Sequence, residues 1–181
     1  MIEHLTLYER AELRMLLAHI LDDQRVPPEA ADYIRQAFRD KLEELARPRP
    51  LTLVYTGWRG AARPRVRADL DAVLDRAGGR LHVIVGYNPD TDDPPGGDRW
   101  TYEWANNEPG VTVETHPAPW DIPELSKSAG PYRNGYMLGL AVGWPGDFGV
   151  LAHLHPKSRG AAGTAAFAEH LRLPLWRRPA T

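Results

Sequence analysis

The chain has 181 residues, a formal charge of −2 at neutral pH, seventeen prolines, sixteen glycines and no cysteine. Its length suits one main domain with an appendage, and a domain of this size buries enough surface to fold without disulfides. The missing cysteine excludes disulfides, a thiolate nucleophile and cysteine-based metal sites, and the near-neutral charge argues against nucleic acid as a partner.

The first fifty residues predict a two-helix hairpin followed by a short, stiff linker. Apolar side chains recur at helical spacing from Leu5 to Leu21, and Thr6 is a suitable N-cap. A second amphipathic stretch runs from Pro28 to Ala46, and the prolines of Arg47–Pro50 end it. Two apolar stripes need a surface to cover them, so we expect the hairpin to contribute to a homodimer interface; a monomer whose hairpin caps its own domain is the alternative.

Residues 51–181 predict the main domain, in which short apolar runs alternate with amphipathic stretches. The predicted strands are Leu51–Thr56, Leu81–Val85, Val111–Thr115, Gly149–His155 and Leu173–Trp176, and the predicted helices are Arg65–Ala77, Asp98–Asn107, a stretch from Ser128 or Gly130 to about Val142, and Gly160–Arg172. Asp98 stands where a helix N-cap is expected. This alternation indicates an α/β fold with a parallel sheet covered on both faces. Right-handed crossovers favour a Rossmann-like, doubly wound sheet of five strands in the order 3-2-1-4-5.

The start of the chain lacks the pattern of a secretory signal peptide. The segment from Met1 to Arg14 is charged and amphipathic, unlike the apolar part of a signal peptide. No apolar run in the sequence approaches the length of a membrane span. We therefore expect a cytoplasmic protein that has no membrane partner.

Two glycine-bearing turns are predicted to meet at the carboxyl edge of the sheet. In the order 3-2-1-4-5 the strand order reverses between the first and fourth strands, which is where such sheets bind ligands. Thr56–Gly60 follows the first strand, and His155–Gly160 follows the fourth. The second turn opens a helix whose first N–H groups lack partners, and Lys157, Ser158 and Arg159 add two cations and a hydroxyl. This convergence favours a phosphate-bearing ligand over the alternative of a plain turn that binds nothing.

Other motifs limit the kind of site that we expect. Gly57–Gly60 lacks the GxGxxG dinucleotide fingerprint and the GK[ST] ending of a Walker loop. His153 and His155 share one face of a strand, but no third ligand has suitable spacing, so we expect no metal and no other cofactor. Trp58 follows the first glycine and is the tryptophan that we expect to stack on a base.

Four blocks of residues 51–176 resemble a known family. They are Val54–Arg59, Gly97-Asp98 followed by Trp104-Ala105, Ala129–Met137, and Ser158-Arg159-Gly160 continuing to Pro174. They are similar to the motifs of the YspA-like branch of the SLOG superfamily, which includes DprA and the Lonely Guy enzymes. The chain departs from the family pattern at Ala161, where a threonine is usual, and at Gly86–Pro89, which replaces a histidine- and glycine-containing motif.

The resemblance implies a Rossmann-like fold that holds a nucleotide or nucleotide-derived ligand at the predicted crevice. It implies homodimers, as in the Lonely Guy enzymes. With Trp58 added from the base-stacking argument and Gly97 from the second block, the expected ligand-binding residues are Gly57, Trp58, Arg59, Gly97, Asp98, Arg133, Asn134, Ser158, Arg159 and Gly160. Among these, Arg133 can grip a phosphate through two hydrogen bonds, and Asn134 can bond a ribose or a base.

Three functions are compatible with such a domain. The first is a binding module that senses or sequesters a nucleotide-derived small molecule. The alternative is an N-glycosidic phosphoribohydrolase that acts on nucleoside monophosphates, but the helix after Ser158 lacks the glutamate of the Lonely Guy motif, since Glu169 comes too late. The third, DNA binding as in DprA, is disfavoured because acidic and basic residues balance from Leu51 onward.

Overall fold

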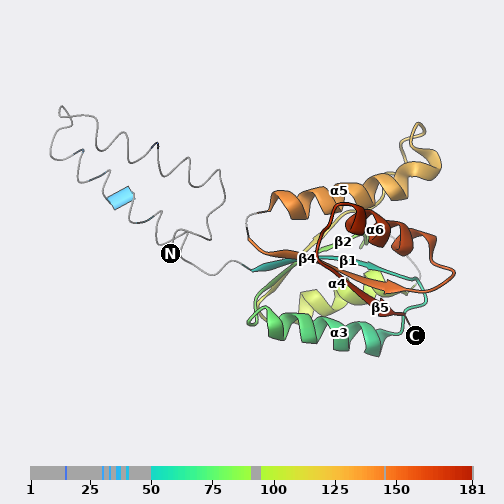
Figure 1. The fold of residues 1–181 in the computed structure, drawn as a ribbon, viewed down its shortest axis with the longest axis horizontal. Coiled ribbons are helices and arrows are strands. Elements are labelled where there is room, and N and C mark those ends of the chain that lie inside the picture. Colours follow the sequence, from blue (N-terminus) through green and yellow to red (C-terminus); the bar gives the residue numbers. More distant parts are fainter. Residues whose placement is uncertain are drawn as a thin grey trace. The chain divides into compact units, whose positions relative to one another are not determined.

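The computed structural model describes residues 50–90, 95–144 and 146–180, together with Met15, Ala30, Tyr33, Gln36, Ala37 and Asp40. The chain divides into two compact units, Met1–Pro48 and Arg49–Thr181. Apart from these six residues, which are helical, the hairpin predicted for residues 5–46 lies outside the described residues. The second unit is an α/β domain, drawn in colour in Figure 1.

A five-stranded parallel sheet forms the middle layer of this unit. Its strands are β1 (Leu51–Gly57), β2 (Leu81–Val85), β3 (Val111–Thr115), β4 (Phe148–Leu154) and β5 (Leu175–Pro179). Their order across the sheet is β3-β2-β1-β4-β5, and every neighbouring pair is parallel. The predicted Rossmann-like fold and its 3-2-1-4-5 order are therefore confirmed.

Four helices cover the two faces of the sheet. They are α3 (Arg63–Arg76), α4 (Gly97–Asn107), α5 (Ala129–Gly143), which follows the 3-10 turn η1 (Ser126–Ser128), and α6 (Arg159–His170). Figure 1 shows α3 and α4 on one face of the sheet and α5 and α6 on the other. None of the helices in the described part of the chain has both the length and the apolar character that a membrane crossing requires.

The two hydrophobic cores follow from the alternation of side chains along the strands. In β1, Leu53 and Tyr55 join the core beneath α3 and α4, whereas Val54 joins the core beneath α5 and α6. In β2, Val83 and Ile84 divide in the same way. The central strands are thus apolar on both faces, and their continuous apolar runs are what identified them in the sequence.

Two details differ from the sequence predictions. The N-cap of α4 is Gly96, without a side-chain hydrogen bond, and Asp98 lies inside the first turn. Strand β5 begins at Leu175 rather than Leu173, because the backbone groups of Leu173 and Pro174 serve the connection from α6. The Leu173 N–H donates to α6, and the Pro174 carbonyl accepts from the N–H of Val150.

Candidate functional site

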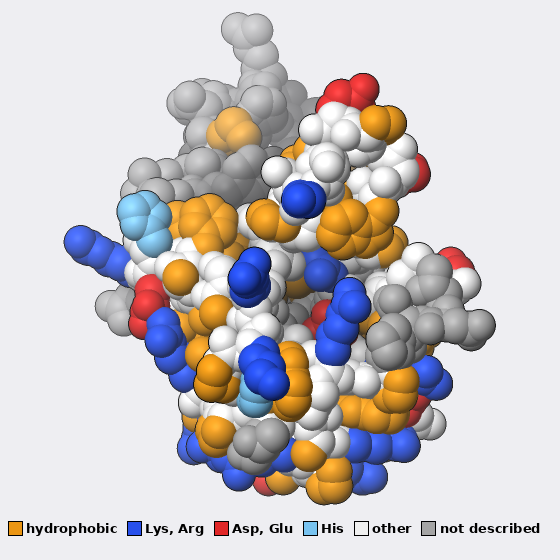
Figure 2. Space-filling view, turned by 90° about the vertical axis from the view of Figure 1, so that its right-hand side faces the viewer, with side chains coloured by type: hydrophobic (Ala, Val, Ile, Leu, Met, Phe, Trp, Pro, Cys, Tyr) orange, Lys and Arg blue, Asp and Glu red, His pale blue; other side chains and the backbone are white. Residues whose placement is uncertain are grey.

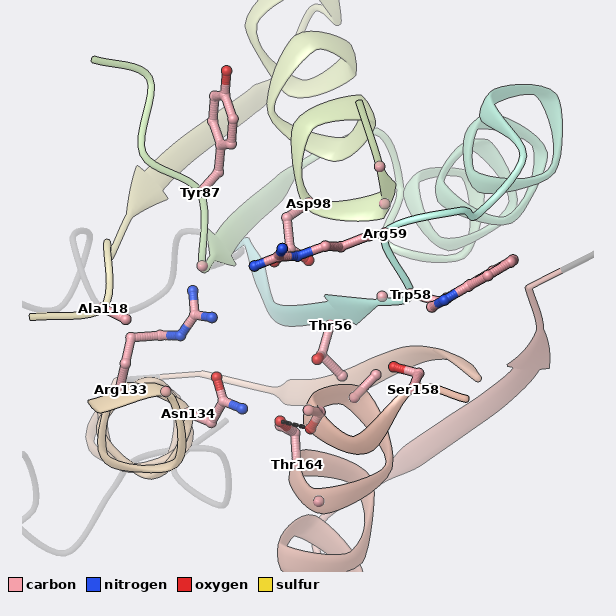
Figure 3. A pocket seen from close by; sticks show the side chains of 18 of the residues that line it. Thr56, Trp58, Arg59, Tyr87, Asp98, Ala118, Arg133, Asn134, Ser158 and Thr164 are labelled. Carbon is pink, nitrogen blue, oxygen red and sulfur yellow. Dashed lines mark hydrogen bonds between the residues drawn. The ribbon is translucent and has the colours of Figure 1, made fainter. Parts of the chain in front are cut away.

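A pocket of about 760 Å³ lies at the carboxyl ends of β1 and β4, where the strand order reverses. The turns after β1 and β2, the loop after β3 and the starts of α4, α5 and α6 surround it (Figure 3). The pocket is lined by all ten residues that the sequence selected: Gly57, Trp58, Arg59, Gly97, Asp98, Arg133, Asn134, Ser158, Arg159 and Gly160. The structure therefore brings them together, and their binding of a ligand stays a prediction.

Close packing between β1 and α4 explains the glycines on one wall. The buried Tyr55 ring lies directly behind them: a Cβ atom on either Gly57 or Gly97 would come within 2.5 Å of its hydroxyl oxygen. The Gly97 N–H donates to the Trp58 carbonyl at 3.2 Å, which fixes the start of α4 against the β1 turn. Burial, with the Asp98 carboxylate as a second cause, holds the pKa of the Tyr55 phenol well above its usual value. A neutral phenol therefore supports this wall from behind.

The turn between β4 and α6 presents the start of a helix to the pocket. The backbone N–H of Lys157 donates to the ring Nδ1 of His155 at 3.1 Å. The backbone N–H of Ser158 donates to the His155 carbonyl at 2.8 Å. Helix α6 begins at the next residue, Arg159, so its first N–H groups have no partner within the helix. Such a helix start is suited to an anion.

The Trp58 indole is already stacked on one side. Its ring and that of His155 are 3.8 Å apart between centroids, with an interplanar angle of 9°. Figure 3 shows the Trp58 ring pointing away from Arg133 and Asn134. Base stacking on Trp58 stays a prediction, and it would need the opposite face of the ring.

Arg133 enters the pocket from α5 across the end of β2. Its Nη1 donates to the His116 carbonyl at 3.2 Å. The guanidinium lies where a side chain on Gly86 would be, because a Cβ atom there would fall 1.4 Å from Nη1. Figure 3 shows Arg59 and Arg133 extending toward each other from opposite sides of the pocket, with Asp98 beside Arg59. Gly86 lines the pocket but was not among the predicted site residues. Its position directly after a buried strand was the signal that could have identified it.

The described part of the pocket wall is rich in positive charge. Its basic residues are Arg59, Arg99, Arg133, Lys157 and Arg159, and Asp98 is the acidic residue among the described lining residues. Figure 2 shows Lys and Arg side chains around a hollow in this face. This local excess of cations contrasts with the charge of −2 on the whole chain. It favours an anionic ligand.

A buried charge cluster lies on the α3 face of the sheet, behind the pocket. His153 Nε2 is 2.9 Å from Asp69, which also accepts from Arg178 at 2.8 Å and pairs with Arg65 at 3.1 Å. Burial lowers the pKa of His153 despite the neighbouring carboxylate. Burial alone would raise the pKa of Asp69, but its hydrogen bonds from Arg178 and His153 outweigh burial and lower it. The cluster joins α3, β4 and β5 in one network.

Across residues 50–90, 95–144 and 146–180, no three histidine or carboxylate side chains are arranged to hold a metal ion. His153 is fully buried against Asp69, and His155 stacks on Trp58, so the two histidines do not converge on one point. Apart from the Asp98 carboxylate, the polar side chains that line the described part of the pocket are cations, amides and hydroxyls, which suit an anion.

Comparison of the chain with family models, curated proteins and solved structures found no match. The resemblance to the SLOG superfamily therefore stays a prediction carried by the four motif blocks. The fold and the geometry of the pocket stand independently of it.

Proposed function

We propose that this protein binds a nucleotide or nucleotide-derived small molecule, which it senses or sequesters, through the pocket at the ends of β1 and β4. The observation that carries the proposal is the concentration of cations around a helix start in a chain of slightly negative charge. A volume of about 760 Å³ is within the range of small-molecule sites and is large enough for a nucleotide.

In this proposal the phosphate lies at the start of α6. Backbone N–H groups of the first turn, the Ser158 hydroxyl and the Arg159 guanidinium supply donors of matching charge. Arg133 offers a second cation from α5, and Asn134 follows it with an amide that can both donate and accept. Cations and amides at these separate positions favour a ligand that carries both a phosphate and neutral polar groups.

The SLOG resemblance points to the same function and is part of the proposal. Its two more specific blocks are Ala129–Met137 and the block that begins at Ser158. They contain Arg133 and Arg159, which line the pocket from different helices. The hydrolase alternative has less support. The described carboxylate of the pocket, Asp98, comes from α4, and Glu169 lies near the end of α6 and does not line the pocket.

The experiment is to identify what the purified full-length protein carries. Mass spectrometry of small molecules released on denaturation should detect a phosphorylated nucleoside or a derivative. Calorimetry with nucleoside monophosphates should then show binding that Arg159→Ala weakens about 10- to 150-fold, the equivalent of one charge-assisted bond of roughly 1.5–3 kcal/mol.

The control variant is Arg67→Ala, because Arg67 is exposed on α3, pairs with Asp71 and does not line the pocket. This variant should bind like the wild type. If no phosphorylated compound is released, and if none of the nucleoside monophosphates binds, the proposed function is wrong.

A further inference from the structure

The pocket wall is divided by chemistry. The cations come from the turns after β1 and β4 and from α4, α5 and α6. The stretch from residue 117 to 131, between β3 and the first turn of α5, contributes five lining residues without a charge: Pro117, Ala118, Trp120, Gly130 and Pro131. Figure 3 shows Ala118 on the same side of the pocket as Arg133, across from Ser158. This uncharged part of the wall, next to Arg133, is the apolar side of the pocket, and the helix start suited to an anion lies across from it.

Trp120 is the largest group on this apolar side. Its side chain is 66% exposed, although it lines a pocket. A Cβ atom on Gly130 would lie 3.6 Å from the edge of the indole, so the ring rests against the first turn of α5. Two backbone hydrogen bonds hold the loop that carries it. The Trp120 N–H donates to the Ala118 carbonyl at 2.9 Å, and the Ile122 N–H donates to the Pro119 carbonyl at 3.3 Å. The ring is thus supported on one edge and open to the pocket.

Trp120 contacts the same face of α5 that carries Arg133 and Asn134. Gly130, which the indole contacts, lies three and four residues before Arg133 and Asn134 on α5, so all three share one face of the helix. A planar group on the indole would therefore have the guanidinium and the amide next to it. An exposed indole that lines a pocket offers a large flat surface on which a planar group can stack.

We infer that Trp120 is the residue on which the aromatic base of the ligand stacks, and that the ligand is a nucleoside phosphate bound with its base on the apolar side and its phosphate at the start of α6. This inference rests on the proposed function and adds the orientation of the ligand. It assigns to Trp120 the role that sequence analysis gave to Trp58, whose ring is already stacked on His155.

Two probes that differ only by the base test the inference on the full-length protein. A nucleoside monophosphate carries the base, and ribose 5-phosphate lacks it. In the wild type, calorimetry should give a higher affinity for the nucleoside monophosphate by about 5- to 150-fold, the contribution of one base stacked on an aromatic ring. Trp120→Ala should remove most of this difference, and it should change the affinity for ribose 5-phosphate less than about twofold. Trp120→Phe should keep most of the difference.

Trp144→Ala is the matched control, because Trp144 is also partly exposed but stacks on His82 and does not line the pocket. It should leave both affinities unchanged. Equal affinity of the wild type for the two probes, or an equal loss for both in Trp120→Ala, would overturn the inference while leaving the proposed function intact. Failure of the wild type to bind either probe would overturn the inference. It would also overturn the proposed function if the purified protein releases no phosphorylated compound.

Discussion

Replacing Gly86 by alanine should disable Arg133 without removing its charge. The new Cβ atom would lie 1.4 Å from Nη1 and 2.1 Å from Cζ of Arg133, so the guanidinium has to leave its place at the end of β2. Its hydrogen bond to the His116 carbonyl, at 3.2 Å, is lost with that movement. The atoms that clash are the far end of a long, flexible side chain, so the backbone of β2 and α5 can stay where it is.

The expected loss is that of one charge-assisted hydrogen bond to the ligand. Such a bond is worth roughly 1.5–3 kcal/mol, which corresponds to a dissociation constant about 10- to 150-fold higher. Stability should fall by about 0.5–1.5 kcal/mol, the usual contribution of the one hydrogen bond that is lost, because no buried apolar contact is removed. Calorimetry with a nucleoside monophosphate measures the first quantity, and urea unfolding measures the second.

The control is Gly139→Ala, because a Cβ atom on this glycine in the middle of α5 meets nothing within 4 Å. That variant should keep its affinity and gain about 0.5–1 kcal/mol of stability, the usual benefit of alanine over glycine in a helix. In the Arg133→Ala background, Gly86→Ala should cost no further affinity. The reasoning is refuted if Gly86→Ala binds like the wild type while Arg133→Ala binds weakly.

Three further predictions concern stability, turnover and assembly. The unfolding free energy should decrease as the pH falls below about 6.5, because the unfolded chain takes up a proton at His153 before the folded protein does. It should decrease again below about 4, because the carboxylate of Asp69 is likewise protonated first in the unfolded chain. A constant unfolding free energy in urea between pH 8 and 3.5 would contradict both expectations. Incubation with adenosine monophosphate should release no adenine on chromatography, because the helix after Ser158 lacks the glutamate of the hydrolase motif; steady release that Asp98→Ala abolishes would instead favour the hydrolase. Light scattering of the full chain at roughly tens of micromolar should give the mass of a dimer, and a monomer mass would refute the expected assembly.

The parts of the fold that were predictable are those encoded in local patterns. Strands β1, β2 and β3 were placed to within one residue. The first two are short, mainly apolar runs that end at a glycine, and β3 is a short alternating run that follows a glycine. Strand β5 was placed two residues too early. It is an edge strand that contains Arg177, Arg178 and Pro179, so its apolar content marks only its beginning. The pocket-lining residues of the turns after β1 and β4 were found because the strand order brings the carboxyl ends of these strands together. Gly97, Arg133 and Asn134 were selected from the family motifs instead.

The contacts that were not predicted depend on distances between distant segments. Asp69 lies among other charged residues of α3, and nothing local separates it from a solvated helix face. Its burial comes from His153 and Arg178, which follow it by roughly a hundred residues. Trp120 is in a loop whose path no periodic pattern describes. Asp98 was expected to cap α4, but Gly96 takes that position. A Cβ atom on Gly96 would lie 2.5 Å from the Arg59 carbonyl oxygen, a contact between distant segments.

The neighbouring positions of β1 and β4 mean that the pocket is built from the two ends of the domain sequence. Thr52 pairs with Phe148 in the middle of the sheet, although the two are separated by roughly a hundred residues of chain. In a Walker-type site, a single strand, loop and helix supply the whole phosphate cradle. Here a growing chain that has not yet reached β4 contains the wall formed by Gly57 and Arg59 but not the opposite wall. Such non-local pairing is also typical of slow folding, because distant segments of the chain must meet before the sheet is complete.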